Sequence, residues 1–233
     1  MAYTTRRQGC PLGTVETWIF DLDNTLYPTS CGLFALVQAK MNQYICDRFG
    51  MTMEEAAALR RKYFLEHGTT MNGLMTVDRI DPHEFLAFVH EVDLTCVPQD
   101  PALAAAIAKL HGRKVVFTNG SVRHAERLLG HLGIADAFTG IVDIVACEFE
   151  PKPALTGYRE LMRRHDVAPA RALMVEDIAR NLAPAAELGM TTAWIRNELD
   201  WAAAEPEADY IHHVIEDLAG FLEAAAAQQA EPR

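Results

Sequence analysis

A short apolar strand that ends in two carboxylates constrains this chain more than any other stretch. Residues 15–20 are rich in β-branched and aromatic side chains, which is typical of a buried strand. Asp21 and Asp23 follow this run directly, and a Tyr-Pro turn comes soon after. Two close carboxylates repel each other, so such a pair normally needs a cation or a shared proton. The alternative is a turn in which both Asp side chains cap backbone amides.

The Asp pair does not belong to a calcium-binding loop of the EF-hand type. That loop requires Gly at its sixth position and Glu at its twelfth. Counting from Asp21, these positions hold Leu26 and Gly32. We therefore favour a functional site at the end of the strand over turn chemistry.

Composition excludes several classes of partner. A chain of 233 residues can bury a sizeable core, and its formal net charge of −11 argues against nucleic acid. The five cysteines form no C-x-x-C pair, which favours reduced thiols over a disulfide framework. No apolar run approaches the roughly 20 residues that span a bilayer, and the Arg6-Arg7 pair precedes no export segment. We expect a cytoplasmic protein that binds no membrane; its oligomeric state is not readable.

Residues 33–97 are expected to form an all-helical insert. Apolar side chains recur at helical spacing up to Gly50, and Gly68 ends a second helix-forming run. The stretch 69–74 is too rich in Gly and Thr for a helix interior, whereas Asp81-Pro82 is typical of a helix start. Three helices are predicted, over residues 33–49, 53–67 and 82–91.

From residue 98 onward, apolar strands alternate with amphipathic helices. This alternation predicts a mostly parallel sheet covered on both faces, with all strand carboxyl ends at one edge. The fold class is therefore α/β, with a Rossmann-like three-layer core over residues 15–32 and 98–222 and flexible tails at 1–14 and 223–233. Further strands are predicted at 114–117, 141–146, 172–175, 192–195 and, weakly, 210–214. Helices are predicted near 101–111, 122–132, 154–165 and 179–188.

Ligands of open α/β sheets bind beyond the carboxyl ends of the strands. The strand that ends at Phe117 is followed by Thr118, Asn119 and Gly120 at the entrance of a helix. A hydroxyl and a Gly-containing helix start form a good anion seat, because unpaired N–H groups and the helix dipole point there. The alternative is that Ser121 merely caps the helix.

Later strands add charges at the same edge. Lys152 stands between two prolines on a stiff backbone, and Glu176 and Asp177 end another strand. Taken singly, the Lys is typical of a solvated side chain and the acidic pair of a helix N-terminus. Taken together, these groups predict a site for Mg²⁺ and a phosphoryl group, because Mg²⁺ prefers one or two carboxylates, waters and substrate phosphate.

The order of these motifs resembles that of the haloacid dehalogenase superfamily. The matching motifs are Asp21-x-Asp23-x-Thr25, Thr118, Lys152 and the pair Glu176-Asp177. The resemblance covers residues 17–222 and identifies the insert at 33–97 as a helical cap. Phosphatases of the superfamily keep the second Asp, which dehalogenases lack, so the resemblance implies a phosphatase.

Longer stretches resemble the pyrimidine 5′-nucleotidase branch, which implies UMP or CMP as the substrate. They are Asp21-Leu-Asp-Asn-Thr-Leu-Tyr-Pro, Phe117-Thr-Asn-Gly with His124-Ala-Glu-Arg, and His67-Gly-Thr-Thr-Met-Asn-Gly-Leu. Where this chain has Glu176-Asp177, many members have Gly-Asp or Asp-Asp, so Glu176 departs from the pattern of the fourth motif. Flavin mononucleotide, nicotinamide mononucleotide and sugar phosphates remain alternative substrates, and a non-catalytic protein that binds phosphorylated metabolites is a third reading.

The resemblance also implies roles for the motif residues. Asp21 is expected to form an aspartyl-phosphate, and Asp23 to act first as acid and then as base. Mg²⁺ is expected on Asp21, the backbone carbonyl of Asp23 and Asp177, with Glu176 beside them. The phosphoryl oxygens are expected to bind Thr118, Lys152, Asn119 and Gly120.

The cap is expected to close over the site and to bind the leaving group. The candidate substrate-binding residues there are Thr69, Thr70, Met71 and Asn72. The side-chain amide of Asn72 can both donate and accept hydrogen bonds. The alternative is that this segment is a purely structural helix-loop-helix. Arg123, His124 and Arg127 are expected on a solvated helix face.

Overall fold

A seven-stranded sheet forms the centre of the computed structural model, which describes residues 2–197 and 208–231. The strand order is β1-β7-β6-β5-β2-β3-β4; among the described strands, β1 alone pairs antiparallel to its neighbour. The strands are β1 (Tyr3–Thr5), β2 (Thr17–Phe20), β3 (Arg113–Phe117), β4 (Gly140–Val142), β5 (Ala172–Glu176), β6 (Thr191–Ile195) and β7 (His213–Ile215). This arrangement confirms the predicted α/β class.

The strand that precedes the two Asp residues lies in the middle of the sheet. All four residues of β2 are buried, and Phe20 pairs with Val116 of β3 and Val175 of β5. Since these three strands run parallel and in register, their carboxyl ends lie side by side. The segments that follow β2, β3 and β5 therefore meet at one edge.

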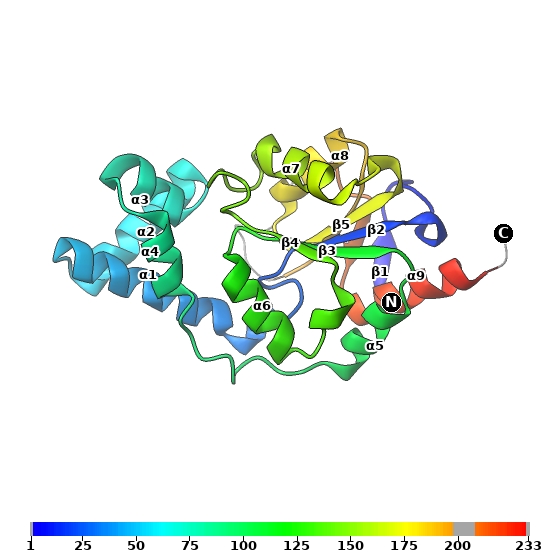
Figure 1. Cartoon of the computed structure of the whole chain (residues 1–233), viewed down its shortest axis with the longest axis horizontal. Helices are drawn as coiled ribbons and strands as arrows, with labels where there is room; N and C mark the ends of the chain where they lie inside the picture. The colour runs from blue at the N-terminus through cyan, green and yellow to red at the C-terminus, as the bar shows by residue number, and fades with distance from the viewer. Residues whose placement is uncertain (1, 198–207, 232–233) are drawn as a thin grey trace.

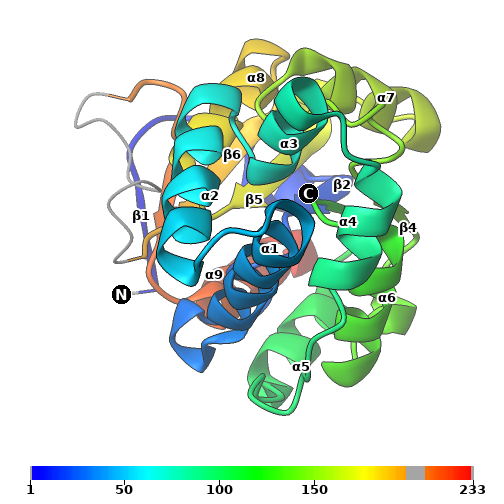
Figure 2. The ribbon, with the colours of Figure 1, turned by 90° about the vertical axis from the view of Figure 1, so that its left-hand side faces the viewer.

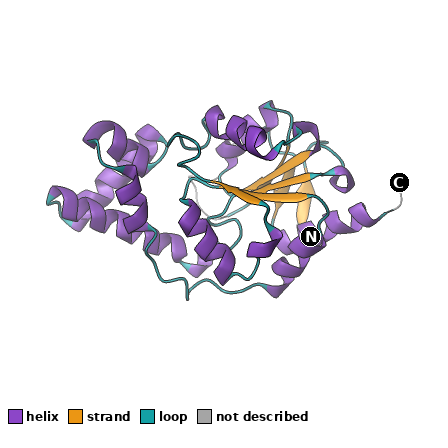
Figure 3. Ribbon diagram, viewed as in Figure 1, coloured by secondary structure: helices purple, strands orange, loops and turns teal. Residues whose placement is uncertain are grey.

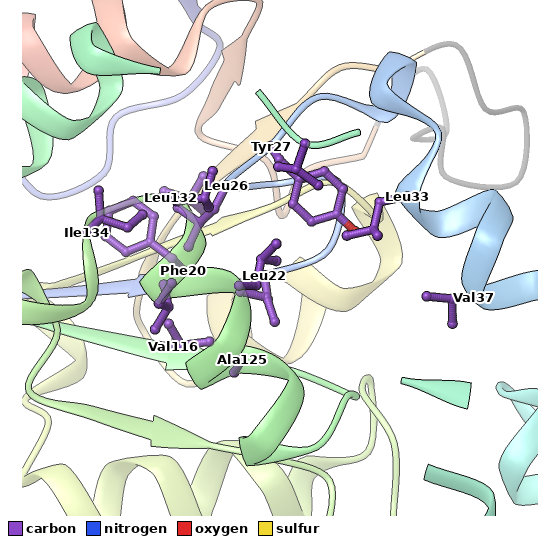
Figure 4. Packing of buried hydrophobic residues seen from close by; sticks show 14 of the residues in the cluster. Phe20, Leu22, Leu26, Tyr27, Leu33, Val37, Val116, Ala125, Leu132 and Ile134 are labelled. Atoms are coloured by element: carbon purple, nitrogen blue, oxygen red, sulfur yellow. The ribbon is translucent and has the colours of Figure 1, made fainter. Parts of the chain in front are cut away.

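Helices cover both faces of the sheet, as Figures 1 and 3 show. On one face Phe20 and Val116 pack with Ala125, Leu132 and Ile134 (Figure 4), and on the other Ile19 packs in a second cluster. The first face carries α5 (Pro101–Lys109), α6 (Val122–His131) and α9 (Leu218–Ala230). The second face carries α7 (Leu155–His165) and α8 (Ala183–Glu187). Alternate β2 side chains thus enter two separate cores, which gives the three layers.

Four helices form a lobe, here called the cap, beyond the carboxyl end of the sheet (Figure 1). Figure 2 looks onto this lobe, with the sheet behind it. They are α1 (Leu33–Phe49), α2 (Met53–His67), α3 (Thr70–Asp78) and α4 (Pro82–Val89). Gly50 has a φ of 68° at the end of α1, and the Thr52 side chain caps α2 with Glu55. The first two predicted helices and the start of the third are confirmed.

The prediction that residues 69–74 do not enter a helix is wrong. The Thr69 hydroxyl accepts a hydrogen bond from the Asn72 backbone amide and thereby begins α3. A Cβ on Gly73 would lie 2.3 Å from the Tyr63 ring of α2. Gly73 is therefore required for the close packing of α2 and α3, and is not a sign of a loop.

Both terminal segments expected to be flexible have secondary structure where they are described. Tyr3–Thr5 form β1 on β7, and the Tyr3 ring lies 4.9 Å from that of Phe221. The helix α9 continues to Ala230, and the Gln229 side-chain amide donates to the Val15 carbonyl. The predicted helix at 179–188 is instead a 3₁₀ turn followed by α8. In the described part of the chain, no helix has the length and apolarity needed to cross a membrane.

Candidate active site

The predicted motif residues converge on one cavity of about 520 Å³ between the sheet edge and the cap. Asp21 and Asp23 enter it from the end of β2, and Thr118 from the end of β3. The later motif residues line the same cavity; they are Lys152, Glu176 and Asp177. The carboxyl-edge rule thus holds for every core residue predicted to act in the site.

Lys152 is buried at the centre of the site rather than solvated. Its Nζ lies 2.7 Å from Asp21 Oδ1 and 2.6 Å from Glu176 Oε2. It also donates to the Phe117 carbonyl, while its backbone N–H donates to Asn119 Oδ1 at 2.8 Å. One ammonium group therefore joins the carboxyl ends of β2, β3 and β5.

The acidic groups of the site outnumber the cation that they share. Burial, and then the charge of Glu176, raise the pKa of Asp21 to about 7 even though Lys152 lies beside it. Burial and Glu176 also raise the pKa of Asp177 well above its usual value. Burial disfavours the charged form of Lys152, but the negative charges of Asp21 and Glu176 outweigh burial and raise the pKa of Lys152. Excess negative charge in a buried place is relieved by a further cation or by protonation of one of the carboxylates.

Oxygen atoms suited to a hard cation lie close together here. Asp21, Glu176 and Asp177 each offer one oxygen within 4.8 Å of the others. Asn181 lines the same cavity, and its buried Oδ1 accepts no hydrogen bond from the described groups. Both Glu176 oxygens are engaged, by Lys152 and by the Ile178 backbone amide. The donor set fits Mg²⁺, with Asp177 better placed than Glu176.

Asp23 has a different environment from Asp21. The Tyr27 hydroxyl lies 2.7 Å and His124 Nε2 lies 3.0 Å from the same oxygen, Asp23 Oδ1. Burial raises the pKa of Asp23, but His124 and then Tyr27 outweigh burial and bring the pKa to about 2. The environment of Asp21 therefore favours its protonated form, whereas the environment of Asp23 favours its ionised form.

The expectation that His124 lies on a solvated face is wrong. His124 is fully buried, because it follows the Ser121 N-cap by three residues and the first turn of α6 faces the site. Arg123 is exposed as expected, and Arg127 donates to the backbone carbonyl of His90. The sequence signal that could have identified His124 is its place in the first helical turn after Thr118.

The segment after β3, which the sequence predicts to be an anion seat, folds around the Thr118 hydroxyl. The Gly120 amide donates to Thr118 Oγ1 at 2.9 Å, and Ser121 caps α6 as the alternative reading proposed. A Cβ on Gly120 would lie 3.3 Å from Thr118 Oγ1 and 3.7 Å from Asp23 Oδ2. The absence of a side chain at Gly120 therefore keeps space between the hydroxyl and the second carboxylate.

The cap supplies a mainly apolar wall to the cavity. Thr69 and Thr70 line it, but the Thr70 hydroxyl donates to the Arg60 carbonyl. Asn72 does not line it, and its side-chain amide donates to the His67 carbonyl at 2.9 Å. The apolar lining residues are Phe34, Val37, Met41, Phe64, Leu65, Met71, Phe85, Leu86 and Val89, and the polar cap residues beside them are Gln38, Arg60 and Arg61. Of these wall residues, the sequence predicts only Met71 as a substrate contact.

Known proteins are similar to this chain over most of its length. The phosphate metabolism protein 8 of Saccharomyces cerevisiae is 28% identical over 193 residues, which cover 75% of this chain and 60% of the yeast protein. This chain thus spans less than two thirds of the yeast relative. The glyceraldehyde 3-phosphate phosphatase of Methanothermobacter thermautotrophicus is 26% identical over 224 residues, which cover 88% of this chain and 96% of that protein.

Solved structures share the fold. The HAD phosphatase from Thermococcus onnurineus has a TM-score of 0.64 at 17% identity, covering 90% of this chain and 97% of that one. The L-2-haloacid dehalogenase from Xanthobacter autotrophicus has a TM-score of 0.59 at 16% identity, covering 91% and 99%. The haloacid dehalogenase-like hydrolase family matches residues 15–189. This chain therefore belongs to the haloacid dehalogenase-like hydrolases.

Proposed function

We propose that this chain is a Mg²⁺-dependent phosphomonoester hydrolase that works through an aspartyl-phosphate on Asp21. One observation carries the proposal: Asp21 lies between Lys152 and Thr25, and the carboxylate of Asp23 stands beside the Thr118 seat. A nucleophile, an acid and an anion seat in one cavity are the parts that phosphoryl transfer requires.

The first step transfers the phosphoryl group to the protein. The Asp21 carboxylate attacks phosphorus, the bond to the ester oxygen breaks, and Asp23 gives its proton to that oxygen. In the second step water attacks phosphorus and Asp23 takes a proton from that water. The bond between phosphorus and the Asp21 oxygen breaks, so phosphate leaves and the Asp21 carboxylate is restored. Thr118 and Lys152 hold the phosphoryl oxygens through both steps.

Asp23 must carry a proton before the first step. The pKa of about 2 describes a site without a ligand, where Asp23 is ionised. A bound phosphoryl group adds negative charge beside Asp23, and a nearby like charge favours the protonated form of a carboxyl. The substrate itself thus promotes the acid form of Asp23.

Asp21, Asp177 and the backbone carbonyl of Asp23 would hold Mg²⁺. The bound ion supplies positive charge that reduces repulsion between a carboxylate and a phosphoryl group. Support comes from the excess negative charge of the buried cluster and from the unpaired Oδ1 of Asn181. Glu176 is assigned to Lys152 and the Ile178 amide, which engage its two oxygens. Asp21 also accepts from Lys152 and Thr25, but it is kept as a ligand because the ion must lie beside the nucleophile to reduce its repulsion from the phosphoryl group.

We propose a pyrimidine nucleoside monophosphate as the substrate. A volume of about 520 Å³ can hold a nucleotide, and a wall with three Phe rings suits a flat base. Gln38, Arg60 and Arg61 are polar groups that could bind base oxygens. Thr69 and Thr70 remain candidate substrate contacts, whereas the placement of Asn72 argues for a role in α3.

The second candidate is a phosphatase of another small metabolite. The name of the archaeal relative makes a triose phosphate one choice, and flavin or nicotinamide mononucleotide and sugar phosphates are others. A mainly apolar wall offers few hydrogen-bond partners to the hydroxyls of a sugar phosphate. It therefore favours a leaving group that carries a planar aromatic base. A protein that only binds phosphorylated metabolites has no need of Asp23.

Phosphate release from a panel of esters, with and without Mg²⁺, tests the proposal. The panel holds UMP, CMP, purine nucleotides, the flavin and nicotinamide mononucleotides, and sugar phosphates, with Asp21→Asn as the blank. Preference for UMP or CMP supports the full proposal, and preference for another ester supports the mechanism with a different substrate. No Mg²⁺-dependent release from any ester would refute the phosphatase.

A further inference from the structure

The two hydrogen bonds to Asp23 converge on one of its oxygens. Tyr27 and His124 both contact Oδ1, at 2.7 and 3.0 Å, and no hydrogen bond from the described residues reaches Oδ2. Oδ2 lies 3.7 Å from the position that a Cβ on Gly120 would take, beside Thr118. The carboxyl group is thus oriented with Oδ1 toward the protein and Oδ2 toward the phosphoryl seat.

The His124 ring is held on both sides. Its side chain is 1% exposed, and the ring stacks on that of His90 with centroids 4.3 Å apart and planes 12° apart. Its Nδ1 is buried and has no partner among the described groups. In the neutral ring a hydrogen on Nδ1 would be an unpaired buried donor, so we assign the hydrogen of the neutral ring to Nε2, which faces Asp23.

His90 ties this arrangement to the end of the cap. It follows α4 directly, and its Nδ1 lies 2.9 Å from Ser121 Oγ. Arg127 donates to the His90 and Val92 carbonyls at 2.7 and 3.0 Å. The His124 ring therefore lies between the carboxyl group of Asp23 and the segment by which the chain returns from the cap to the core.

We propose that His124 is a positioning residue for the acid Asp23, which it orients together with Tyr27. This inference rests on the proposed phosphatase function. A protonated carboxyl group has one O–H and one acceptor oxygen. Because two donors occupy Oδ1, the proton of Asp23 lies on Oδ2, next to the ester oxygen that leaves.

The chemistry gives this role a specific signature. When the P–O bond breaks, its electron pair stays on the leaving oxygen, which takes the proton from Oδ2 while Asp23 becomes a carboxylate. An alkoxide is a poor leaving group and needs that proton, whereas the acetate of acetyl phosphate leaves without one. Loss of the correct orientation of the Asp23 carboxyl group should therefore slow phosphoryl transfer from alkyl phosphate esters but not from acyl phosphates.

The test compares first-turnover rates for these two classes of phosphate. Rapid quench of holoenzyme with Mg²⁺ measures release of the alcohol from the best nucleotide of the panel and of acetate from acetyl phosphate. His124→Phe keeps a ring against His90 but removes the donor. It should slow the nucleotide reaction about 10²-fold or more, by the usual contribution of a general acid, and change the acetyl phosphate rate less than about threefold.

Further variants separate orientation from folding. His124→Gln keeps an N–H donor and should recover a large part of the nucleotide rate, and Tyr27→Phe should show the same selective loss as His124→Phe. Arg123→Gln, on the exposed side of the same helix, should leave both rates unchanged. If His124→Phe does not fold, the Tyr27→Phe and His124→Gln rates decide the matter.

The outcomes distinguish this inference from the function on which it rests. Equal loss with both phosphates, or no loss with the nucleotide, would overturn the positioning role while wild-type turnover still supports the phosphatase. No turnover of either phosphate by the wild-type protein would refute the phosphatase itself.

Discussion

Lys152 Nζ lies 2.7 Å from Asp21 Oδ1, although 131 residues separate the two in sequence. The same ammonium group lies 2.6 Å from Glu176 Oε2, and all three side chains are buried. The Lys thus offsets part of the charge that surrounds the proposed nucleophile. Its removal should affect folding as well as chemistry.

Lys152→Met should lower stability by leaving Asp21 and Glu176 buried without their shared cation. Removal of one partner of a buried ion pair costs about 3–5 kcal/mol of unfolding free energy. Mg²⁺ then becomes the principal cation for the cluster, so it should stabilise the variant more than the wild type. Urea unfolding with and without Mg²⁺ measures both effects.

Lys114→Met is the matched control. Lys114 is also buried, but its Nζ donates to the backbone carbonyls of Leu110 and Gly112. This variant should lose stability without any change in the Mg²⁺ effect. An identical Mg²⁺ effect in Lys152→Met and the wild type would contradict a common charge cluster.

Asp177→Asn should weaken Mg²⁺ binding by at least about tenfold, and Glu176→Gln by less. The reason is that Lys152 and the Ile178 amide engage both Glu176 oxygens, whereas Asp177 accepts from Asn197 at Oδ2. Isothermal titration with Mg²⁺ alone measures the affinities. A stronger loss in Glu176→Gln than in Asp177→Asn would reverse our assignment of the ligands.

His213 should make the fold less stable in mild acid. Its ring is 5% exposed and contacts Tyr3 and Phe221, and burial, with His212 beside it, lowers its pKa to about 4. An unfolded His titrates near 6.5, so between the two pKa values the unfolded chain binds the extra proton. The neutral His213 ring therefore contributes on the order of 2–3 kcal/mol to the free energy of unfolding above about pH 6.5. This contribution is lost as pH falls toward 4.

Urea unfolding at a series of pH values measures this dependence. His213→Gln should be less sensitive to pH between about 4 and 6.5 than the wild type. His111→Gln, which changes an exposed ring, should keep the wild-type slope. An unchanged slope in His213→Gln would show that other groups cause the acid sensitivity.

The apolar wall of the cap should control substrate affinity, and Asn72 should not. Phe64→Ala should raise KM for UMP about tenfold, because a cavity-lining ring is removed, and should leave acetyl phosphate nearly unaffected. Asn72→Ala should lower stability by about 1 kcal/mol through loss of its bond to the His67 carbonyl, with KM unchanged. A selective rise of KM for UMP in Asn72→Ala would restore Asn72 as a base contact.

The sequence was sufficient for the core site because its signals are local and the sheet adds a simple rule. The buried run at β2 and the polar residues after β2, β3 and β5 can be identified one by one. Parallel pairing then brings the ends of the strands to one edge. The positions of Thr118 and Lys152 beside Asp21 follow from that rule.

The features that the sequence did not reveal depend on distant contacts. Three residues of β1 gain their order from β7, some 210 residues away, so no local pattern marks them. Gly73 belongs to a helix only because Tyr63 packs against it. His124 gains its role from the orientation of α6 relative to Asp23, which no spacing along the chain specifies.

The covalent intermediate on Asp21 is the central claim, and one measurement tests it directly. Asp23→Asn should still accept a phosphoryl group from acetyl phosphate, because acetate leaves without a proton, but it lacks the base that hydrolyses the intermediate. The reaction is run with Mg²⁺ and stopped with acid, and mass spectrometry should then find a phosphoryl group on the peptide that contains Asp21. The double variant Asp21→Asn/Asp23→Asn should carry no phosphoryl group on that peptide. Phosphate release by the wild type with no such adduct in Asp23→Asn would contradict the mechanism.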